Sequence, residues 1–581
     1  MENITVKLGK IVSDAFVKAG YGGDSAPAVT VTLSDRPDLC QFQSNSAFAY
    51  SKVFRKAPFM ISDDVAKVLN DSDILTAESV KPGFININLK DSYILSLLQE
   101  LAEDEHYGIA QQSGKLVMDY GGPNVAKPLH IGHLRSAIIG QSLKNIARMC
   151  GLTVTSDIHL GDWGLQIGLV IAELADRHPE WNCFAENYDG SPVPELDVDL
   201  LNEVYPTASA RSKTDEAFTA KAHTATFELQ SGRAGYMALW REIMRVSCED
   251  LKKNYDALGV DFDCWYGESD ADKYIPGLYA LLEEKGLSYE SDGALVVDVA
   301  KEDDKSPVPP IIVRKSDNSS IYATTDLATI IQRQQDFAPD MIWYVVDNRQ
   351  EFHFTQVFRC ARLAGLVPED TKLEFLGFGT MNGKDGKPYK TREGGVMRLS
   401  DLIGTVCEAA RARLDESGKV DESEREEYAK RIGIAAIKFG DLINHRSKDY
   451  IFDLDKFLSA DGKTGVYVLY AVSRINSVMA KAANEKGSFE VISTDSERAL
   501  ALKLISSPES FGAALRERAP SFVCDDMYNL AAAFSGFYHE NRIADEEDAS
   551  KRSTRLALCA LTRRMITAEL DALGIKPVEK M

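Results

Sequence analysis

Hydrophobic and polar positions divide the chain into three stretches with different patterns. In the N-terminal stretch, short strand-like and helical segments are mixed, and the apolar residues of FININL alternate with asparagines as in a half-buried strand. Between Lys115 and about Asp370, apolar runs such as KLVMDY, LTVTSDI, GALVVDV and MIWYVV alternate with helical segments. This alternation is typical of a parallel sheet with crossover helices. After Tyr450 the pattern is almost wholly helical, with amphipathic runs such as VYVLYAVSRINSVMAKA.

These patterns predict a multidomain protein that combines α/β and all-α domains. We expect a small α/β domain over residues 1–108, a Rossmann-like domain with a doubly wound parallel sheet over 109–455, and a helical bundle over 456–581. An insertion rich in acidic and polar residues, near 177–259, separates the early strands from the later ones. A chain of 581 residues is too long for one hydrophobic core, which agrees with this division.

Composition narrows the class and the compartment. Hydrophobic residues make up 44% and charged residues 27% of the chain, as in folded globular proteins. No apolar run approaches the roughly 18 residues needed to span a bilayer, and the N-terminus lacks the apolar core of a signal peptide. The nine cysteines contain no CxxC pair, which argues against a disulfide framework and a cysteine-rich zinc site. We therefore expect a cytoplasmic protein without zinc and without membrane contact.

The net charge bears on nucleic-acid binding. It is −22, from 66 basic and 88 acidic side chains, so the whole chain is not an obvious partner for RNA. Binding depends on local basic patches rather than on the total. From residue 456 onward basic and acidic residues are equal in number, so the excess acid lies in the earlier part. The negative net charge is therefore a weaker argument against RNA binding by the C-terminal stretch.

The most informative segment is KLVMDYGGPNVAKPLHIGHLRSAIIGQSLKNIARMCG, which has the pattern of a strand, a Gly/Pro loop and a helix. From Ile139 onward, apolar residues recur at the spacing of one helix face, which predicts an amphipathic helix. Gly151 follows as a candidate C-cap. His130 and His133 fall at the start of the helix, where unpaired N–H groups and the positive dipole end favour phosphate. The two imidazoles share one face, and Gly132 leaves room for a flat base.

The segment PNVAKPLHIGH resembles the HIGH signature of class I aminoacyl-tRNA synthetases, in the form characteristic of the arginyl-tRNA synthetase family. DIHLGDWGLQIG, GESDAD, IYATTDLA, YVVDNRQEFHF and GKDGKPYKTREGG are similar to that family's later catalytic blocks, in the same order. SKDYIFDLDKFL, YVLYAVSRINSV and LDALGIKPVEKM resemble its helical anticodon-binding domain, and FQSNSAFAYSK and PGFININL its N-terminal domain.

The resemblance covers nearly the whole chain and implies a function. The expected reaction joins L-arginine to tRNA(Arg) with ATP through an arginyl-adenylate, releasing AMP and pyrophosphate. It also implies Mg²⁺ alongside ATP, a requirement for bound tRNA before arginine is activated, and a monomer. The domain at 1–108 is then the additional tRNA-contacting domain, 109–455 the catalytic domain and 456–581 the anticodon-binding domain.

A site for arginine should contain carboxylates, because a guanidinium is a flat, charged fork that carboxylates bind through paired hydrogen bonds. Tyr322 and Asp326 are four residues apart, on one side of a helical turn. Asn124 and Gln350 match family positions that hold the amino and carboxylate groups of the substrate. The arginine-binding residues that the resemblance implies are Asp119, Asn124, Glu268, Tyr322, Asp326 and Gln350.

The resemblance also assigns residues to ATP and to catalysis. His130 and His133 are expected to steady the phosphates in the transition state, where positioning and charge neutralisation dominate. Asp347 and His353 could touch the ribose or adenine, or serve the structure alone. The predicted ATP-binding residues are Pro123, Asn124, His130, Gly132, His133, Asp347, His353 and Met381.

The second class I signature, usually KMSKS, is replaced here by GKDGKPYKTREGG. Its basic residues Lys384, Lys387, Lys390 and Arg392 can all carry charge to phosphates, and the sequence does not rank them. Lys127 looks like the family lysine that substitutes for the missing one. The predicted catalytic residues are His130, Gly132, His133, Lys127, Lys390 and Arg392.

Recognition of tRNA is expected at two places. Arginine and tyrosine side chains can stack on and hydrogen-bond unpaired bases, which is how RNA sequence is mostly read. Core packing is an equal alternative for the tyrosines of the helical stretch. The predicted tRNA-binding residues are Phe42, Gln43 and Asn45 near the N-terminus, and Tyr470, Arg474, Tyr538 and Arg542 in the helical stretch.

Three other functions are considered. A cysteine or glutamine enzyme of the same class is disfavoured by the absence of a Cys/His zinc cluster and by the acidic pair Glu268 and Asp326. An inactive tRNA-binding paralogue has no use for His130, His133 and Asn124 together. A nucleotidyltransferase that does not use tRNA leaves the helical C-terminal stretch unexplained.

Overall fold

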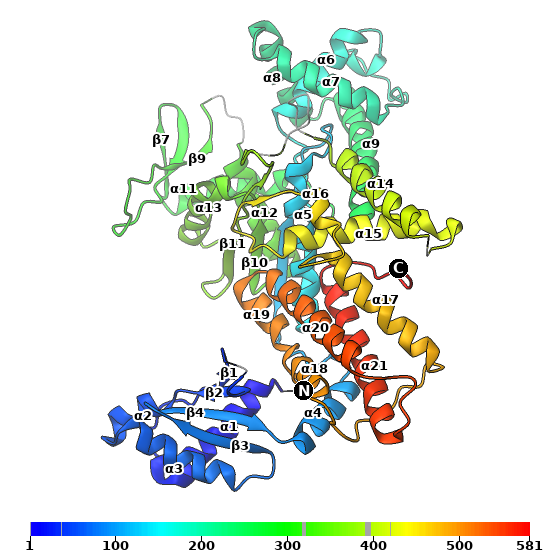
Figure 1. The fold of residues 1–581 in the computed structure, drawn as a ribbon. Helices are drawn as coiled ribbons and strands as arrows, with labels where there is room; N and C mark the ends of the chain where they lie inside the picture. Colours follow the sequence, from blue (N-terminus) through cyan, green and yellow to red (C-terminus); the bar gives the residue numbers. More distant parts are fainter. Residues whose placement is uncertain (1, 37, 317–320, 388, 390–396, 419) are drawn as a thin grey trace.

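A computed structural model describes residues 2–36, 38–316, 321–387, 389, 397–418 and 420–581 of the chain. Over these residues the molecule has a small α/β part at the N-terminus, a central α/β part and a C-terminal group of helices (Figure 1). The three parts follow one another in the order that the hydrophobic pattern predicts. Among the described residues, no helix is both long and apolar enough to cross a membrane.

The N-terminal part is an antiparallel sheet flanked by helices. Its strands pair in the order β1-β2-β4-β3. Ile85 and Ile87 of β4 are fully buried, so the alternating segment is a strand as predicted. The elements are α1 (Ile4–Phe16), the π-helical turn η1 (Val17–Tyr21), β1 (Thr32–Leu33), β2 (Phe42–Ser44), α2 (Ala47–Phe54), α3 (Pro58–Asn70), β3 (Leu75–Val80), β4 (Phe84–Leu89) and α4 (Asp91–Glu103).

The central part contains the predicted parallel sheet. Its order is β11-β10-β5-β6, and all three pairs are parallel. The segments KLVMDY, LTVTSDI and MIWYVV supply three of the strands. The strands are β5 (Lys115–Tyr120), β6 (Thr153–Asp157), β10 (Met341–Val345) and β11 (Lys372–Phe375).

The prediction that GALVVDV belongs to this sheet is wrong. That segment forms β8 (Ala294–Val297), which pairs antiparallel with β7 (Ser288–Ser291) and β9 (Ile311–Arg314) in a separate sheet. Asp292 and Gly293 between β7 and β8 both have positive φ. An Asp-Gly pair with this backbone makes a two-residue hairpin, and this local signal outweighs the apolar run.

Helix α5 (Ile131–Met149) runs through the middle of the molecule (Figure 1) and is buried on nearly all sides, not only on its apolar face. Gly140 allows its close approach to the sheet, because a Cβ there would lie 2.2 Å from Cγ of Tyr120 on β5. The charged side chain of Arg135 is buried and forms an ion pair, in which its Nε lies 3.0 Å from Oδ2 of Asp441. The one-sided apolar pattern therefore understates how central this helix is.

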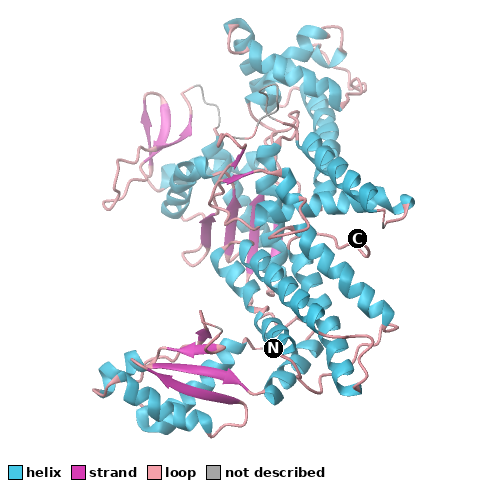
Figure 2. Cartoon of the chain, in the orientation of Figure 1, coloured by secondary structure: helices cyan, strands magenta, loops and turns pink. Residues whose placement is uncertain are grey.

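The remaining elements cover the sheet, form the insertion and build the C-terminal part, and the elements described after β13 are all helices (Figure 2). The insertion predicted near 177–259 consists of α7 to α9. Helices around the sheet and in the insertion are α6 (Leu165–Arg177), η2 (Asn182–Phe184), α7 (Val198–Arg211), α8 (Glu216–Gln230), α9 (Ala234–Leu258), α10 (Glu268–Ala271), η3 (Asp272–Tyr274), α11 (Ile275–Glu284), α12 (Tyr322–Phe337), η4 (Asn348–Gln350) and α13 (Glu351–Ala364). Later elements are β12 (Met381–Asn382), α14 (Leu399–Ser417), α15 (Glu422–Leu442), β13 (Tyr450–Ile451), α16 (Leu454–Phe457), α17 (Gly465–Lys481), α18 (Asp495–Ser506), α19 (Glu509–Glu517), α20 (Ser521–Glu540) and α21 (Ala549–Ala572).

A buried charge cluster joins α12 to the sheet. Asp119 and Asp157 are register partners at the ends of β5 and β6, and an Nη2 atom of Arg333 lies 2.7 Å from the first carboxylate and 2.9 Å from the second. The three residues are at most 7% exposed. One guanidinium thus compensates two neighbouring carboxylates that would otherwise repel each other away from water.

We expect Arg333→Met to lower the free energy of unfolding by about 3–5 kcal/mol, because it leaves two buried carboxylates without a cation. Urea unfolding followed by circular dichroism measures the change. The control Lys10→Met removes a cation from an exposed pair with Glu2 and should leave the midpoint nearly unchanged. A similar midpoint shift in both variants would contradict the role given to Arg333.

Candidate functional site

A cavity of about 570 Å³ opens where the strands β5 and β10 end. This is the edge of an open parallel sheet at which ligands usually bind. The cavity collects most of the residues that the sequence proposed for two different ligands. Those lining it are Asp119, Asn124, His130, Gly132, His133, Glu268, Tyr322, Asp326, Asp347, Gln350 and His353.

The two histidines cap the N-terminus of α5. The backbone N–H of Gly132 donates to Nδ1 of His130 over 3.0 Å, and the backbone N–H of His130 donates to Nδ1 of His133 over 3.1 Å. The latter Nδ1 also lies 3.3 Å from the carbonyl oxygen of His130, a longer contact. A neutral imidazole that accepts at Nδ1 carries its proton on Nε2. Both rings therefore keep an Nε2–H donor that the cap does not use.

Both imidazoles are neutral near pH 7. Burial, together with the neighbouring His130 and Lys127, lowers the pKa of His133 to about 3. Burial also lowers the pKa of His130, helped by the charges of Lys127 and Arg349. The ring centroids are 4.0 Å apart, so two protonated rings would repel each other strongly. The pair can donate hydrogen bonds to an oxyanion without carrying charge of its own.

Gly132 lies in the same turn for a steric reason. A Cβ at this position would lie 2.7 Å from Cε1 of His130. A side chain would therefore displace the imidazole, in addition to filling the space expected for a base.

The acidic side of the cavity is formed by Glu268 and Asp326. Glu268 is 8% exposed, and burial raises its pKa to about 7. His159 opposes this increase, whereas Asp162 and Asp326 add to it. A carboxyl group in this state ionises readily when a cation enters, as a guanidinium would.

Four of the predicted residues that line the cavity already have side-chain partners. Nε2 of His353 lies 2.6 Å from Oδ2 of Asp326, so a residue proposed for ATP contacts one proposed for arginine. Nε2 of Gln166 donates to the hydroxyl of Tyr322 over 2.7 Å. Asp119 is paired with Arg333, so its carboxylate is largely occupied by the fold. Among the predicted carboxylates, Glu268 and Asp326 remain the better candidates for arginine.

Other predicted residues do not line this cavity. Pro123 is buried, and its carbonyl accepts from the backbone N–H of Gly161 over 3.1 Å. Met381 is 6% exposed and belongs to the core. Lys127 lines a separate small hollow, although its charge reaches both histidines. Lys390 and Arg392 lie outside the described residues.

The sequence analysis matched the turn that follows β6 to a block of the family but assigned no site residue to it. His159 lines the cavity with a positive φ of 48°, and its buried Nδ1 has no hydrogen-bond partner among the described residues. Gly161 pairs with the loop before α5: its carbonyl accepts from Val125, and a Cβ on it would lie 2.2 Å from Oδ1 of Asn124. The segment DIHLGDWG, a polar and glycine-containing turn after a strand, was the available signal.

The predicted tRNA-binding residues are scattered. Tyr470 and Arg474 line a hollow of about 310 Å³ between α17 and α20, together with His539. The guanidinium of Arg474 lies 5.1 Å from the ring centroid of Tyr538. Arg542 is exposed on the turn after α20.

In the N-terminal part, the prediction for Phe42 needs correction. Its ring is 2% exposed and packs in the core, so it supports the domain and does not offer a surface to RNA. Nε2 of Gln43 donates to Asn86 over 2.9 Å, and Asn45 is exposed.

Among the described residues, no cysteine lines the cavity. All nine cysteines are free thiols. Within the described residues, no group of three or more His, Cys, Asp or Glu side chains is arranged to hold a metal ion.

Comparison with known families follows the division of the fold. Residues 96–454 match the family described as "tRNA synthetases class I (R), catalytic domain". The flanking residues 5–89 match "Arginyl tRNA synthetase N terminal domain", and 468–581 match "DALR anticodon binding domain". The chain is thus a class I aminoacyl-tRNA synthetase in fold and catalytic domain.

Similar proteins define the family more narrowly. The chain is 47% identical to an arginine–tRNA ligase of Alkaliphilus oremlandii and 45% identical to one of Agathobacter rectalis, each match covering 100% of both chains. The crystal structure of arginyl-tRNA synthetase from Plasmodium falciparum has the same fold, with a TM-score of 0.82, 24% identity and 100% coverage of both chains. This chain belongs to the arginyl-tRNA synthetase family.

The close approach of Gly161 to Asn124 can be tested by Gly161→Ala. The added Cβ should displace the Asn124 amide and lower kcat/KM for arginine roughly 100-fold, the effect expected from a misplaced contact of about 1 Å. Aminoacylation kinetics measure this loss. The control Gly277→Ala changes an exposed position of α11, where a Cβ meets nothing within 4 Å. It should keep full activity. Unchanged kinetics in Gly161→Ala would remove Asn124 from the substrate site.

The pKa of Glu268 predicts a pH-dependent affinity for arginine. The guanidinium binds the ionised carboxylate, so binding must release the proton that Glu268 holds below about pH 7. We expect the Kd for arginine, measured by calorimetry, to rise up to about tenfold for each pH unit below 7 and to level off above about pH 8. Glu268→Gln should bind more weakly and without this slope. The same slope in Glu268→Gln would assign it to another group.

Proposed function

We propose that this enzyme activates L-arginine with ATP to arginyl-adenylate and then transfers the arginyl group to tRNA(Arg). The observation that carries the assignment is the cavity itself, which is lined by His130 and His133, each with an Nε2–H that the cap does not use, and by Glu268 and Asp326. Phosphate donors and cation-binding carboxylates in one cavity suit the joining of an anionic nucleotide to a cationic amino acid.

The arginine guanidinium is held by Glu268 and Asp326, with the hydroxyl of Tyr322 as a third partner. Carboxylates bind its flat fork through paired hydrogen bonds. A substrate amino acid with a neutral or anionic side chain cannot form these charge-assisted pairs. Asn124 and Gln350 hold the amino and carboxylate groups of the substrate. Because Asp326 is already hydrogen-bonded to His353, binding of arginine also orients that histidine.

In the first step, the arginine carboxylate attacks the α-phosphorus of ATP and pyrophosphate leaves. The neutral rings of His130 and His133 donate Nε2–H hydrogen bonds to the phosphate oxygens as negative charge builds up on them. Such fixed donors are commonly worth a factor of about 10²–10³ each in rate. Neither ring transfers a proton in this step. Lys127 adds positive charge to the same region.

We also propose that Mg²⁺ would be held mainly by the phosphates of ATP. Magnesium usually keeps several waters and takes its remaining ligands from substrate phosphates and one or two carboxylates. When bound, it neutralises charge on the departing pyrophosphate. The basic residues Lys390 and Arg392 are proposed to act on the same phosphates.

In the second step, the terminal ribose hydroxyl of the tRNA attacks the adenylate and AMP leaves. We assign residues 109–455 to catalysis, 456–581 to the anticodon and 1–108 to a further tRNA contact through Gln43 and Asn45. Tyr470, Arg474, Tyr538 and Arg542 are the proposed anticodon-side contacts. The enzyme works as a monomer in the cytoplasm.

Aminoacylation of total tRNA with each of the standard amino acids, with and without ATP, tests the assignment. We expect charging by arginine alone, and none when ATP is omitted. Exchange between pyrophosphate and ATP should require both arginine and tRNA. Binding of tRNA without charging by any amino acid would instead indicate a binding protein derived from this family.

A further inference from the structure

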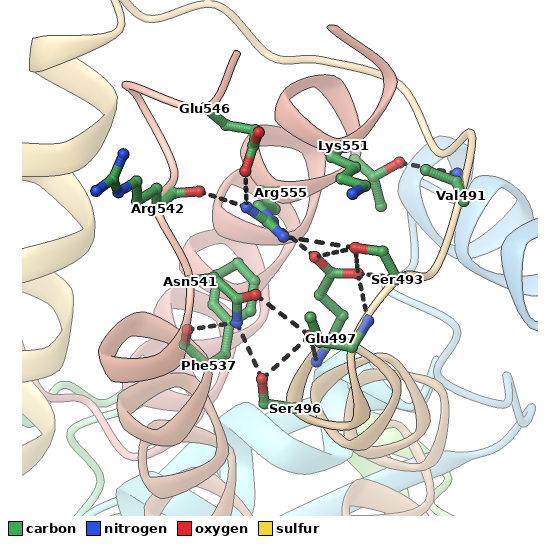
Figure 3. A network of polar contacts seen from close by, with 12 residues as sticks. Val491, Ser493, Ser496, Glu497, Phe537, Asn541, Arg542, Glu546, Lys551 and Arg555 are labelled. Atoms are coloured by element: carbon green, nitrogen blue, oxygen red, sulfur yellow. Dashed lines mark hydrogen bonds and ion pairs between the residues drawn. The ribbon is translucent and has the colours of Figure 1, made fainter. Parts of the chain in front are cut away.

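The turn at residues 541–548, which connects α20 to α21, is held by an extensive polar network (Figure 3). Its first residue, Asn541, is 8% exposed. The side-chain amide of Asn541 donates to Oγ of Ser496 over 2.9 Å and to the carbonyl of Phe537 over 2.8 Å. Its Oδ1 accepts from the hydroxyl of Thr494 over 3.2 Å. The turn is therefore fixed to α18 where it begins.

Two arginines of α21 hold the rest of the turn. Nη1 of Arg555 donates to the carbonyl of Arg542 over 2.7 Å and to the carboxylate of Glu546. Nε of Arg552 donates to the carbonyl of Ala544 over 3.1 Å. Backbone or side-chain atoms at three alternate positions of the turn are thus tied to the same helix.

Arg555 is itself fixed by a buried carboxylate. Its Nε donates to Glu497 over 2.6 Å, and the side chains are 6% and 1% exposed. Glu497 also accepts the backbone N–H groups of Ser493 and Thr494, over 2.6 and 3.2 Å, which caps α18. A buried ion pair gives little stability beyond what well-packed apolar side chains would give. What this pair provides is a fixed geometry for the guanidinium.

The side chain of Arg542 takes no part in the network. It is exposed, points away from the network in Figure 3, and has no hydrogen-bond or ion-pair partner among the described residues. In the chain it follows Tyr538, whose ring lies 5.1 Å from the guanidinium of Arg474, and His539, which lines a hollow together with Arg474. The structure therefore holds the backbone of Arg542 rigidly and leaves its cationic group available.

We propose that Arg555, held by Glu497, is a positioning residue for tRNA binding: it fixes the turn so that Arg542 meets a phosphate of the tRNA. The proposal rests on the proposed function, in which this part of the chain binds tRNA. A pre-set backbone reduces the conformational entropy that Arg542 loses on binding, so one exposed arginine can contribute a full charge-assisted contact.

A double-mutant cycle on tRNA affinity tests the proposal. Arg542→Gln removes the contact, and Arg555→Lys keeps a charge near Glu497 but cannot reach its several partners with one ammonium. Each change should weaken tRNA binding roughly tenfold, the value of one charge-assisted hydrogen bond. The double variant should be weakened little more than either single one. The salt dependence of log Kd should fall by about one unit of slope in all three.

Controls separate positioning from stability and from loss of charge. Arg516→Gln removes an exposed cation of the same C-terminal part that pairs with Glu517, and should change Kd less than about twofold. If Arg555→Lys unfolds, Arg555→Met with Glu497→Gln removes the ion pair and keeps an amide oxygen for the α18 cap. In that background Arg542→Gln should again have little further effect.

Multiplicative losses in the cycle, or an unchanged salt slope in Arg542→Gln, would overturn the proposal. These measurements use binding alone. Failure of the wild type to charge any tRNA with arginine would overturn the proposed function but leave the cycle interpretable.

Discussion

The arrangement of the cavity at the ends of β5 and β10 depends on a single buried cation, Arg333. Two parallel strands end in neighbouring aspartates, Asp119 and Asp157, and the guanidinium from α12 lies within 2.9 Å of both. Without it, two carboxylates would face each other in a medium that solvates charge poorly. The same contact fixes α12 relative to the strand ends. Tyr322 and Asp326, in the first turns of this helix, therefore line the cavity at those ends.

A second buried arginine, Arg135, connects the first turns of α5 to other parts of the chain. Arg135 pairs with Asp441 of α15 and donates to the carbonyls of Gly379 and Lys448, over 2.7 and 3.1 Å. It connects the helix capped by His130 and His133 with the segments that precede β12 and β13. Loss of these contacts would leave Arg135 and Asp441 buried and charged without compensation, so the connected elements have few alternative arrangements.

The chemistry of the site follows from the same low polarity. Burial keeps both imidazoles neutral and raises the pKa of Glu268 to about 7. A neutral donor pair can strengthen its hydrogen bonds as charge develops on phosphate, without attracting the ground state strongly beforehand. A carboxyl group that ionises when a guanidinium enters avoids an uncompensated buried charge while the site is empty. These protonation states suit the cationic guanidinium and the anionic phosphates of the proposed substrates.

The sequence by itself determined the three-part organisation, the parallel sheet, the helix at His130 and the family, because these depend on local periodicity and on short motifs with fixed spacing. It also selected Glu268, Asp326 and Tyr322, whose residue types suit a guanidinium and which line one cavity. It could not show that GALVVDV leaves the main sheet through an Asp-Gly hairpin, that Phe42 is core, or that Asp119 is engaged by Arg333. Nor did it indicate His159, Gly161 or the network around Arg555. Each of these depends on contacts between residues far apart in the chain, and such contacts decide burial and pairing, which only the tertiary structure specifies.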